Sequence, residues 1–148
     1  MVKATSPPTL YQQDLVAWCD DTVAKLKMGD FAALDIEGLI EEIEGLAGRD
    51  RRELKSRLRV LLAHLLKRIY VVAPSDYRGW EITIREQRRQ LLDLLEQSPS
   101  LRNEVEPLFS KCWAEALATV REDYPQTMFP DRWPGSTELD ALLSEKVW

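Results

Sequence analysis

Apolar residues recur at steps of three and four along most of the chain, which is the spacing of amphipathic helices. The first stripe runs from Thr9 to Lys27 and contains Tyr11, Leu15, Trp18, Cys19 and Leu26. Thr9 is a suitable N-cap, and Gly29 is a suitable residue to end the helix. The pattern predicts a first helix over residues 9–27.

Two further helices are expected between Asp35 and Val72. The earlier one ends at Gly48 and turns an apolar stripe inward, formed by Ile36, Leu39, Ile40, Ile43 and Leu46. Asp50 and Glu53 have the spacing of a capping box, so we place a new helix start there rather than one continuous helix. The later helix is the expected core element, because its apolar residues cover a broad face for five turns: Leu54, Leu58, Leu61, Leu62, Leu65 and Ile69.

The remaining pattern predicts a helix from about residue 79 to 97, one from 99 to 124 and a short one from 136 to 143. Pro107 is expected to kink or divide the second of these, because proline removes a backbone donor. No pattern of period two is long enough for a sheet. The sequence therefore predicts an all-α, single-domain antiparallel bundle of about five to six helices. Residues 1–8 are expected to be a flexible N-terminus, 9–143 the bundle and 144–148 a tail.

Composition agrees with an ordinary folded domain. Hydrophobic residues make up 45% of the 148 residues and charged residues 30%. No apolar run approaches the ~20 residues of a membrane span, and the first eight residues lack the apolar core of a secretory signal. We expect a cytoplasmic protein that does not cross a membrane.

Few residues suit catalysis or metal binding. The two cysteines, Cys19 and Cys112, are far apart and are expected to be free, half-buried thiols. A single histidine leaves little for a multi-histidine metal site or a Ser-His-Asp triad. The glycines are scattered, so no phosphate-binding loop is formed. The sequence favours a non-enzymatic protein without a cofactor.

One alternative is a carboxylate-and-histidine metal site or hydrolase formed by Glu41, Glu42, Glu44 and His64, because helical bundles gather such ligands from facing helices. The Glu-x-x-His spacing of a di-metal site is absent. A hairpin at Gly48 would bring His64 closer to Asp35 than to Glu41. A hydrogen-bonded structural histidine is the interpretation that the pattern favours.

Charge is distributed unevenly. Residues 49–89 contain 12 Lys or Arg against 5 Asp or Glu, whereas the rest contains 8 against 20. Glu41 and Glu44 are expected to pair with basic residues of the next helix, such as Arg52, Lys55 or Arg59. The alternative is a nucleic-acid surface formed by Lys67, Arg68, Arg85, Arg88 and Arg89. The acidic excess elsewhere would repel a phosphate backbone.

Four large apolar residues near the C-terminus form a candidate interaction patch: Met128, Phe129, Trp133 and Trp148. An exposed terminal aromatic residue such as Trp148 could anchor a partner subunit. It could also fold back onto the bundle. These two readings stay open.

Several motifs occur together in a fixed order. They are Leu-Ile-Glu-Glu-Ile-Glu at 39–44, the long run Arg-Arg-Glu-Leu-Lys-Ser-Arg-Leu-Arg-Val-Leu-Leu-Ala-His-Leu-Leu-Lys at 51–67, Thr-Ile-Arg-Glu-Gln-Arg at 83–88, Ser-Pro-Ser-Leu at 98–101 and Phe-Pro at 129–130. With these motifs the chain resembles a bacterial family known as domain of unknown function 29, which is abundant in cyanobacteria. The resemblance covers about residues 10–143. It implies a helical fold in the bacterial cytoplasm and brings no established activity.

Polar residues inside these motifs suggest an inter-helix ion network, because a charge within an apolar helix is costly to bury unless it is paired. The residues concerned are Glu41, Glu44, Arg57, Lys67, Arg85 and Arg88. The function that the sequence favours is that of a small helical adaptor or regulatory protein, acting through a protein partner or as a homo-oligomer.

Overall fold

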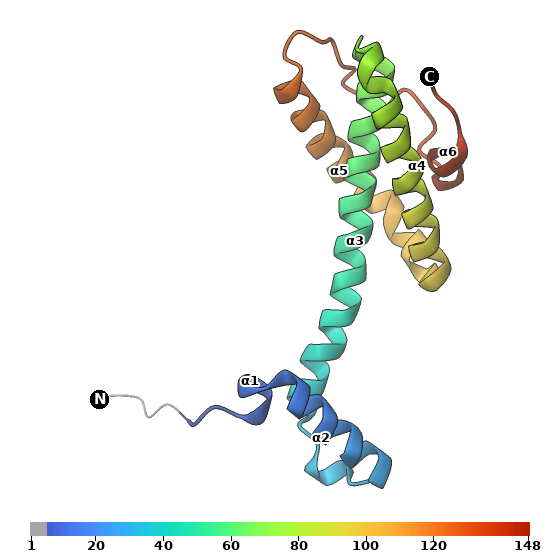
Figure 1. The fold of residues 1–148 in the computed structure, drawn as a ribbon. Helices are drawn as coiled ribbons and strands as arrows, with labels where there is room; N and C mark the ends of the chain where they lie inside the picture. Colours follow the sequence, from blue (N-terminus) through green and yellow to red (C-terminus); the bar gives the residue numbers. More distant parts are fainter. Residues whose placement is uncertain (1–5) are drawn as a thin grey trace. The chain divides into compact units, whose positions relative to one another are not determined.

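Figure 1 shows the computed structural model of the chain, which describes residues 6–148. Within that range it is helical and has no strand, which confirms the predicted all-α helical bundle. Chain contacts divide it into two compact units, and the boundary falls between Ala47 and Gly48. Each unit is described by itself. Residues 1–5 of the expected flexible N-terminus lie outside the described residues, and residues 6–8 are exposed.

The first unit contains α1 (Leu10–Gln13), α2 (Leu15–Met28), the 3₁₀ helix η1 (Phe31–Ala33) and the first turns of α3 (Ile36–Tyr70). The single helix expected over residues 9–27 is two helices. Asp14 separates them, because its backbone is extended (φ −151°, ψ 96°) and its carboxylate accepts the Ala17 N–H at 3.0 Å. Gly29 ends α2 in the left-handed conformation, as predicted.

Trp18 of α2 is the buried apolar side chain of this unit, with 5% of its surface exposed. Gly38 of α3 permits the packing, because a Cβ on Gly38 would lie 3.0 Å from Trp18 Cζ2. The Tyr11 ring lies 4.7 Å from the Trp18 ring, between ring centroids. Its hydroxyl donates a hydrogen bond to Glu42 at 2.6 Å. Two aromatic rings and a glycine thus join α1 and α2 to α3.

The helix break expected at Gly48 is wrong, because α3 runs without interruption from Ile36 to Tyr70. A glycine ends a helix when it takes positive φ, and among the described glycines only Gly29 does so. A helical glycine costs about 1 kcal/mol relative to alanine, which the good helix formers on either side offset. The capping-box spacing of Asp50 and Glu53 therefore lies inside a helix. No turn at Gly48 folds His64 back towards Asp35.

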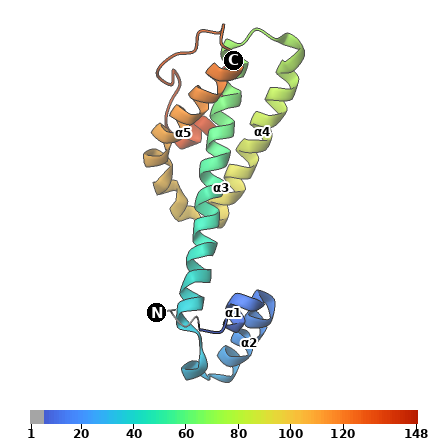
Figure 2. The ribbon, with the colours of Figure 1, turned by 90° about the vertical axis from the view of Figure 1, so that its left-hand side faces the viewer.

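The second unit packs α4 (Pro74–Gln97) and α5 (Arg102–Asp123) along the C-terminal half of α3, and α6 (Leu139–Ser144) contacts α4 (Figure 1, Figure 2). The predicted core leucines of α3 are 0–1% exposed, whereas Ile69 is half-buried. They pack against buried residues of the other helices, among them Ile84, Leu91, Leu95, Val105, Phe109 and Cys112. This is the principal core of the chain.

Three helix boundaries differ from the prediction. α4 begins at Pro74 rather than near Gly79, because proline is well suited to the first helical position. α5 follows the 3₁₀ helix η2 (Pro99–Leu101) and is not divided at Pro107. Proline there removes one intrahelical hydrogen bond near the start of a long helix, which the remaining turns tolerate. The final helix begins at Leu139 rather than Ser136.

The cysteines are not half-buried as expected: Cys19 is exposed and Cys112 is buried. In the described part of the chain, no helix combines the length and the apolarity that crossing a membrane requires.

Candidate functional site

The first unit exposes an unusual share of large apolar side chains. Of the fifteen large hydrophobic residues that are exposed in the described chain, eleven lie between residues 10 and 46. They are Leu10, Leu15, Val16, Val23, Leu26, Met28, Phe31, Ile36, Ile40, Ile43 and Leu46. Concentrated apolar exposure of this kind marks interaction surfaces.

Ile36, Ile40 and Ile43 are aligned on one side of α3, and we call them the isoleucine stripe. They are 54%, 51% and 62% exposed. The sequence pattern predicted that these isoleucines face inward, which is wrong. Periodicity identifies residues that share a side of a helix, but it does not show whether another element covers that side.

Three buried leucines of the second unit repeat the spacing of the isoleucine stripe. Each isoleucine precedes a buried leucine by 18 residues: Leu54 follows Ile36, Leu58 follows Ile40 and Leu61 follows Ile43. Eighteen residues are five helical turns at about 3.6 residues per turn. The three leucines are at most 1% exposed, whereas the isoleucines are more than half exposed. The same apolar spacing is thus covered in the second unit and bare in the first.

Acidic residues accompany the isoleucine stripe. Glu37, Glu41 and Glu44 are exposed and follow one another at steps of four and three along α3. Residues 6–47 contain nine Asp or Glu and two Lys or Arg, a net charge of −7. The surface of the first unit is therefore both apolar and strongly acidic.

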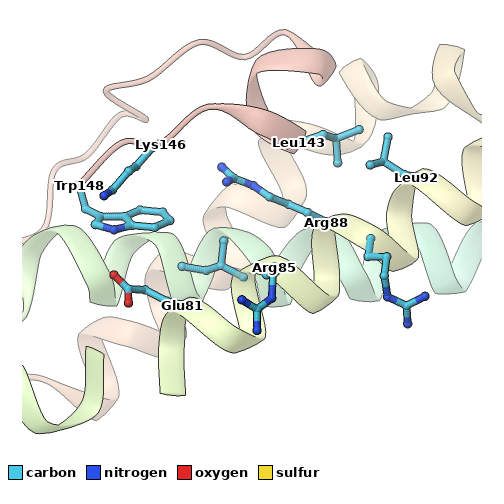
Figure 3. A pocket seen from close by; sticks show the side chains of 9 residues that line it. Glu81, Arg85, Arg88, Leu92, Leu143, Lys146 and Trp148 are labelled. Atoms are coloured by element: carbon cyan, nitrogen blue, oxygen red, sulfur yellow. The ribbon is translucent and has the colours of Figure 1, made fainter. Parts of the chain in front are cut away.

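A second candidate site is a groove of about 590 Å³ in the second unit, between α4 and the C-terminal segment (Figure 3). Its lining combines basic and apolar side chains. The lining residues are Glu81, Ile84, Arg85, Arg88, Arg89, Leu92, Leu143, Lys146 and Trp148. Figure 3 shows Arg88 reaching from α4 towards the C-terminal segment, whereas Arg85 extends from the same helix away from that segment.

Arg88 fixes one wall of the groove. Its Nε donates to the Leu142 carbonyl at 2.8 Å and its Nη2 to the Glu145 carbonyl at 2.6 Å. Burial lowers the pKa of Arg88 from its ordinary value, while the nearby Glu145 acts in the opposite direction. The residue anchors the chain after α6 onto α4.

The metal-site candidates are distributed along α3. Glu42 accepts the Tyr11 hydrogen bond, Glu41 and Glu44 are exposed, and His64 belongs to the second unit. Among residues 6–148, no three His, Cys, Asp or Glu side chains lie close enough together to hold a metal ion.

His64 is partly buried beside α5. Its Nδ1 lies 2.9 Å from the Val60 carbonyl, which fits Nδ1–H donating to that oxygen, and its Nε2 lies 3.4 Å from Lys67 Nζ. Burial lowers the pKa of His64, and the Lys67 charge acts in the same direction. The lowered pKa favours the neutral ring at pH 7.

The residues of the predicted ion network have separate partners. Arg57 pairs with Glu53 at 2.7 Å, Lys67 lies 5.5 Å from the Trp80 ring, and Arg88 binds backbone carbonyls. Arg85 lines the groove. Two of the three expected partners of Glu41 and Glu44 are engaged elsewhere, since Lys55 and Arg59 both pair with Glu115.

The four residues of the predicted interaction patch differ in exposure. Met128 is 89% exposed, Phe129 is 8% exposed, and Trp133 and Trp148 are half-buried. Trp133 packs on Trp113 and donates to the Ser136 carbonyl at 3.1 Å. Trp148 packs against the core and lines the groove. An exposed patch shared by all four is therefore not formed. Of the basic residues that line the groove, Lys146 alone was absent from the basic surface that the sequence suggested, because it lies 61 residues after Arg85.

The comparisons with known proteins give a family without a function. No curated protein and no solved structure matches the chain. The family model described as "Domain of unknown function DUF29" matches residues 10–148. Because that match spans nearly the whole sequence, the chain belongs to the DUF29 family.

Proposed function

We propose that the chain is a helical adaptor or regulatory protein that binds a basic, amphipathic helix of a partner protein on its first unit. The isoleucine stripe is the observation that carries this proposal. In the second unit, leucines of α3 with the same spacing are covered by helices of the chain itself. A helix from a partner would cover the first half in the same manner.

The isoleucine stripe offers binding energy. Full burial of an aliphatic side chain contributes about 1.5–3 kcal/mol, so covering the exposed half of each isoleucine contributes roughly 1 kcal/mol. Eight further exposed apolar residues on the same unit extend the available surface. A partner helix with apolar residues at three- and four-residue steps would match this spacing.

Charge indicates which helix fits. The first unit carries a net charge of −7, and Glu37, Glu41 and Glu44 accompany the stripe. The first unit of a second copy carries the same negative charge and would be repelled. A helix with Lys and Arg beside its apolar face would be attracted, and its association would slow as salt is added.

The nucleic-acid alternative has less support. Arg68 pairs with Glu81 at 3.0 Å, Arg89 pairs with Glu86 and Asp93, and Arg88 binds backbone carbonyls. Paired cations neutralise few phosphates. A hydrolase centred on Glu41, Glu42, Glu44 and His64 would need those groups to converge on one substrate, and Glu42 is already engaged by Tyr11.

Affinity co-purification from the native bacterium tests the proposal when a stripe variant is included. The tagged wild type, an Ile40→Gln/Ile43→Gln variant and a Val72→Gln/Ile82→Gln control are compared, with and without nuclease. The control removes two exposed apolar residues outside the first unit, where Val72 is 88% and Ile82 46% exposed.

The expected result is a partner that survives nuclease, is retained by the control and is lost with the stripe variant. A partner retained by both variants would overturn the role of the isoleucine stripe. Loss of the co-purified material on nuclease treatment would favour the nucleic-acid alternative. Sedimentation velocity on the purified chain tests whether the stripe binds a second copy of the chain instead. Self-association that the stripe variant abolishes would mean that the occupant is a second copy and not a partner helix.

A further inference from the structure

The groove beside α4 has the two properties of a small-molecule site: an apolar wall and charges that the chain does not neutralise. The wall is formed by Ile84 and Leu143, which are 1% and 6% exposed, together with Leu92 and the Trp148 ring. The volume of about 590 Å³ falls within the range of ligand pockets, roughly 300–1,000 Å³.

Of the four basic side chains that line the groove, two bind other groups of the described chain and two do not. Arg89 pairs with Glu86 at 2.8 Å and with Asp93 at 3.3 Å, and Arg88 is held by backbone carbonyls. The one acidic side chain in the lining, Glu81, pairs with Arg68 at 3.0 Å. Arg85 and Lys146 have no ion pair and no hydrogen bond within residues 6–148.

The Trp148 ring adds an aromatic surface to the groove. Its ring is half-buried against the core, and Lys146 Nζ lies 5.7 Å from its centroid while the Arg68 guanidinium carbon lies 5.5 Å from it. A ring held by cations and packed on a core is fixed in place. An aromatic or aliphatic ligand could lie along it without first ordering the side chain, which lowers the cost of binding.

We propose that this groove binds a small amphipathic anion, namely a carboxylate with an aromatic or short aliphatic body. The body lies against Ile84, Leu143 and Trp148, and the carboxylate lies at the basic rim of the groove, to which Arg85 and Lys146 contribute. The inference does not depend on the partner helix, because the groove belongs to the second unit and the isoleucine stripe to the first. A ligand there would also touch the segment that Arg88 anchors, and would stabilise it.

The test is isothermal titration of the full chain with 1-naphthoate, and with 1-naphthylmethanol as the neutral probe of similar shape. The variants are Arg85→Gln/Lys146→Gln and the control Arg78→Gln, which removes an exposed charge of the same helix away from the groove. Circular dichroism establishes that each variant is folded.

Naphthoate is expected to bind the wild type and the control, and to bind the double variant about tenfold or more weakly, since the variant loses the charge-assisted hydrogen bonds to the carboxylate. Naphthylmethanol is expected to bind all three proteins weakly. Equal binding of the acid and the alcohol, equal binding by the double variant, or no binding of naphthoate at millimolar concentration would each overturn the proposal.

Discussion

The Tyr11 hydroxyl donates a 2.6 Å hydrogen bond to the Glu42 carboxylate, and this bond joins α1 to α3. The bond raises the pKa of Tyr11 well above its ordinary value, and partial burial and the charge of Glu41 act in the same direction. Donating to a carboxylate is a property of the neutral phenol, so the bond is present at neutral pH and is lost when the phenol ionises at high pH.

Replacing Tyr11 with Phe removes this bond. We expect faster hydrogen exchange of the α1 amides and loss of a tyrosine that ionises at unusually high pH in an ultraviolet titration. Tyr77→Phe is the control, because it removes a hydroxyl that donates to the Val71 carbonyl in the second unit. Unchanged exchange in α1 of the Tyr11 variant would show that the bond does not hold that helix.

Gly48→Ala tests whether α3 is continuous. A helical glycine is less favourable than alanine by about 0.5–1 kcal/mol, so the variant should raise the free energy of unfolding by that amount. The new Cβ would lie 3.3 Å from Arg52 Nη1, the far end of a flexible side chain. Gly45→Ala is the matched control, since nothing lies within 4 Å of its new Cβ. Chemical denaturation that shows Gly45→Ala stabilising and Gly48→Ala destabilising would indicate a turn at Gly48.

For residues 36–61, the sequence predicts which residues share a side of the helix but not which of them are covered. The three- and four-residue steps identify both the isoleucine stripe and the core leucines, and the core leucines are confirmed as buried. The same steps predicted that Ile36, Ile40 and Ile43 face inward, whereas they are exposed. Periodicity does not reveal whether another helix lies alongside. The groove was not predicted, because Arg85 and Lys146 come together only when the C-terminal segment packs on α4.

His64 predicts a pH dependence of stability. Burial lowers its pKa below the ordinary 6.5 in the folded state. The folded state therefore favours the neutral ring, and the stability linked to it is present above pH 6.5 and is lost as the pH falls below 6.5. Between about pH 7.5 and about pH 5.5 the wild type should lose more thermal stability than His64→Asn. Parallel losses in the two proteins would contradict a buried neutral histidine.

The two thiols should differ in reactivity. Cys19 is exposed, whereas Cys112 is fully buried and lies 3.5 Å from the Lys55 carbonyl. Burial raises the pKa of the Cys112 thiol, and Glu115 acts in the same direction. With Ellman's reagent, the native chain should show one fast thiol, and Cys19→Ser should show none until the chain is unfolded. A fast thiol in native Cys19→Ser would place Cys112 at the surface.

The central claim is that the isoleucine stripe binds a basic, amphipathic helix, and a peptide titration tests it most directly. A synthetic Leu/Lys peptide with helical apolar spacing is titrated into the wild type, Ile40→Gln/Ile43→Gln and Val72→Gln/Ile82→Gln, with a scrambled peptide of the same composition as the control. The helical peptide is expected to bind the wild type and the Val72/Ile82 variant, with an affinity that falls as salt is added. The stripe variant is expected to bind it weakly, and the scrambled peptide is expected to bind all three proteins weakly. Equal affinity of the stripe variant and the wild type for the helical peptide would contradict it.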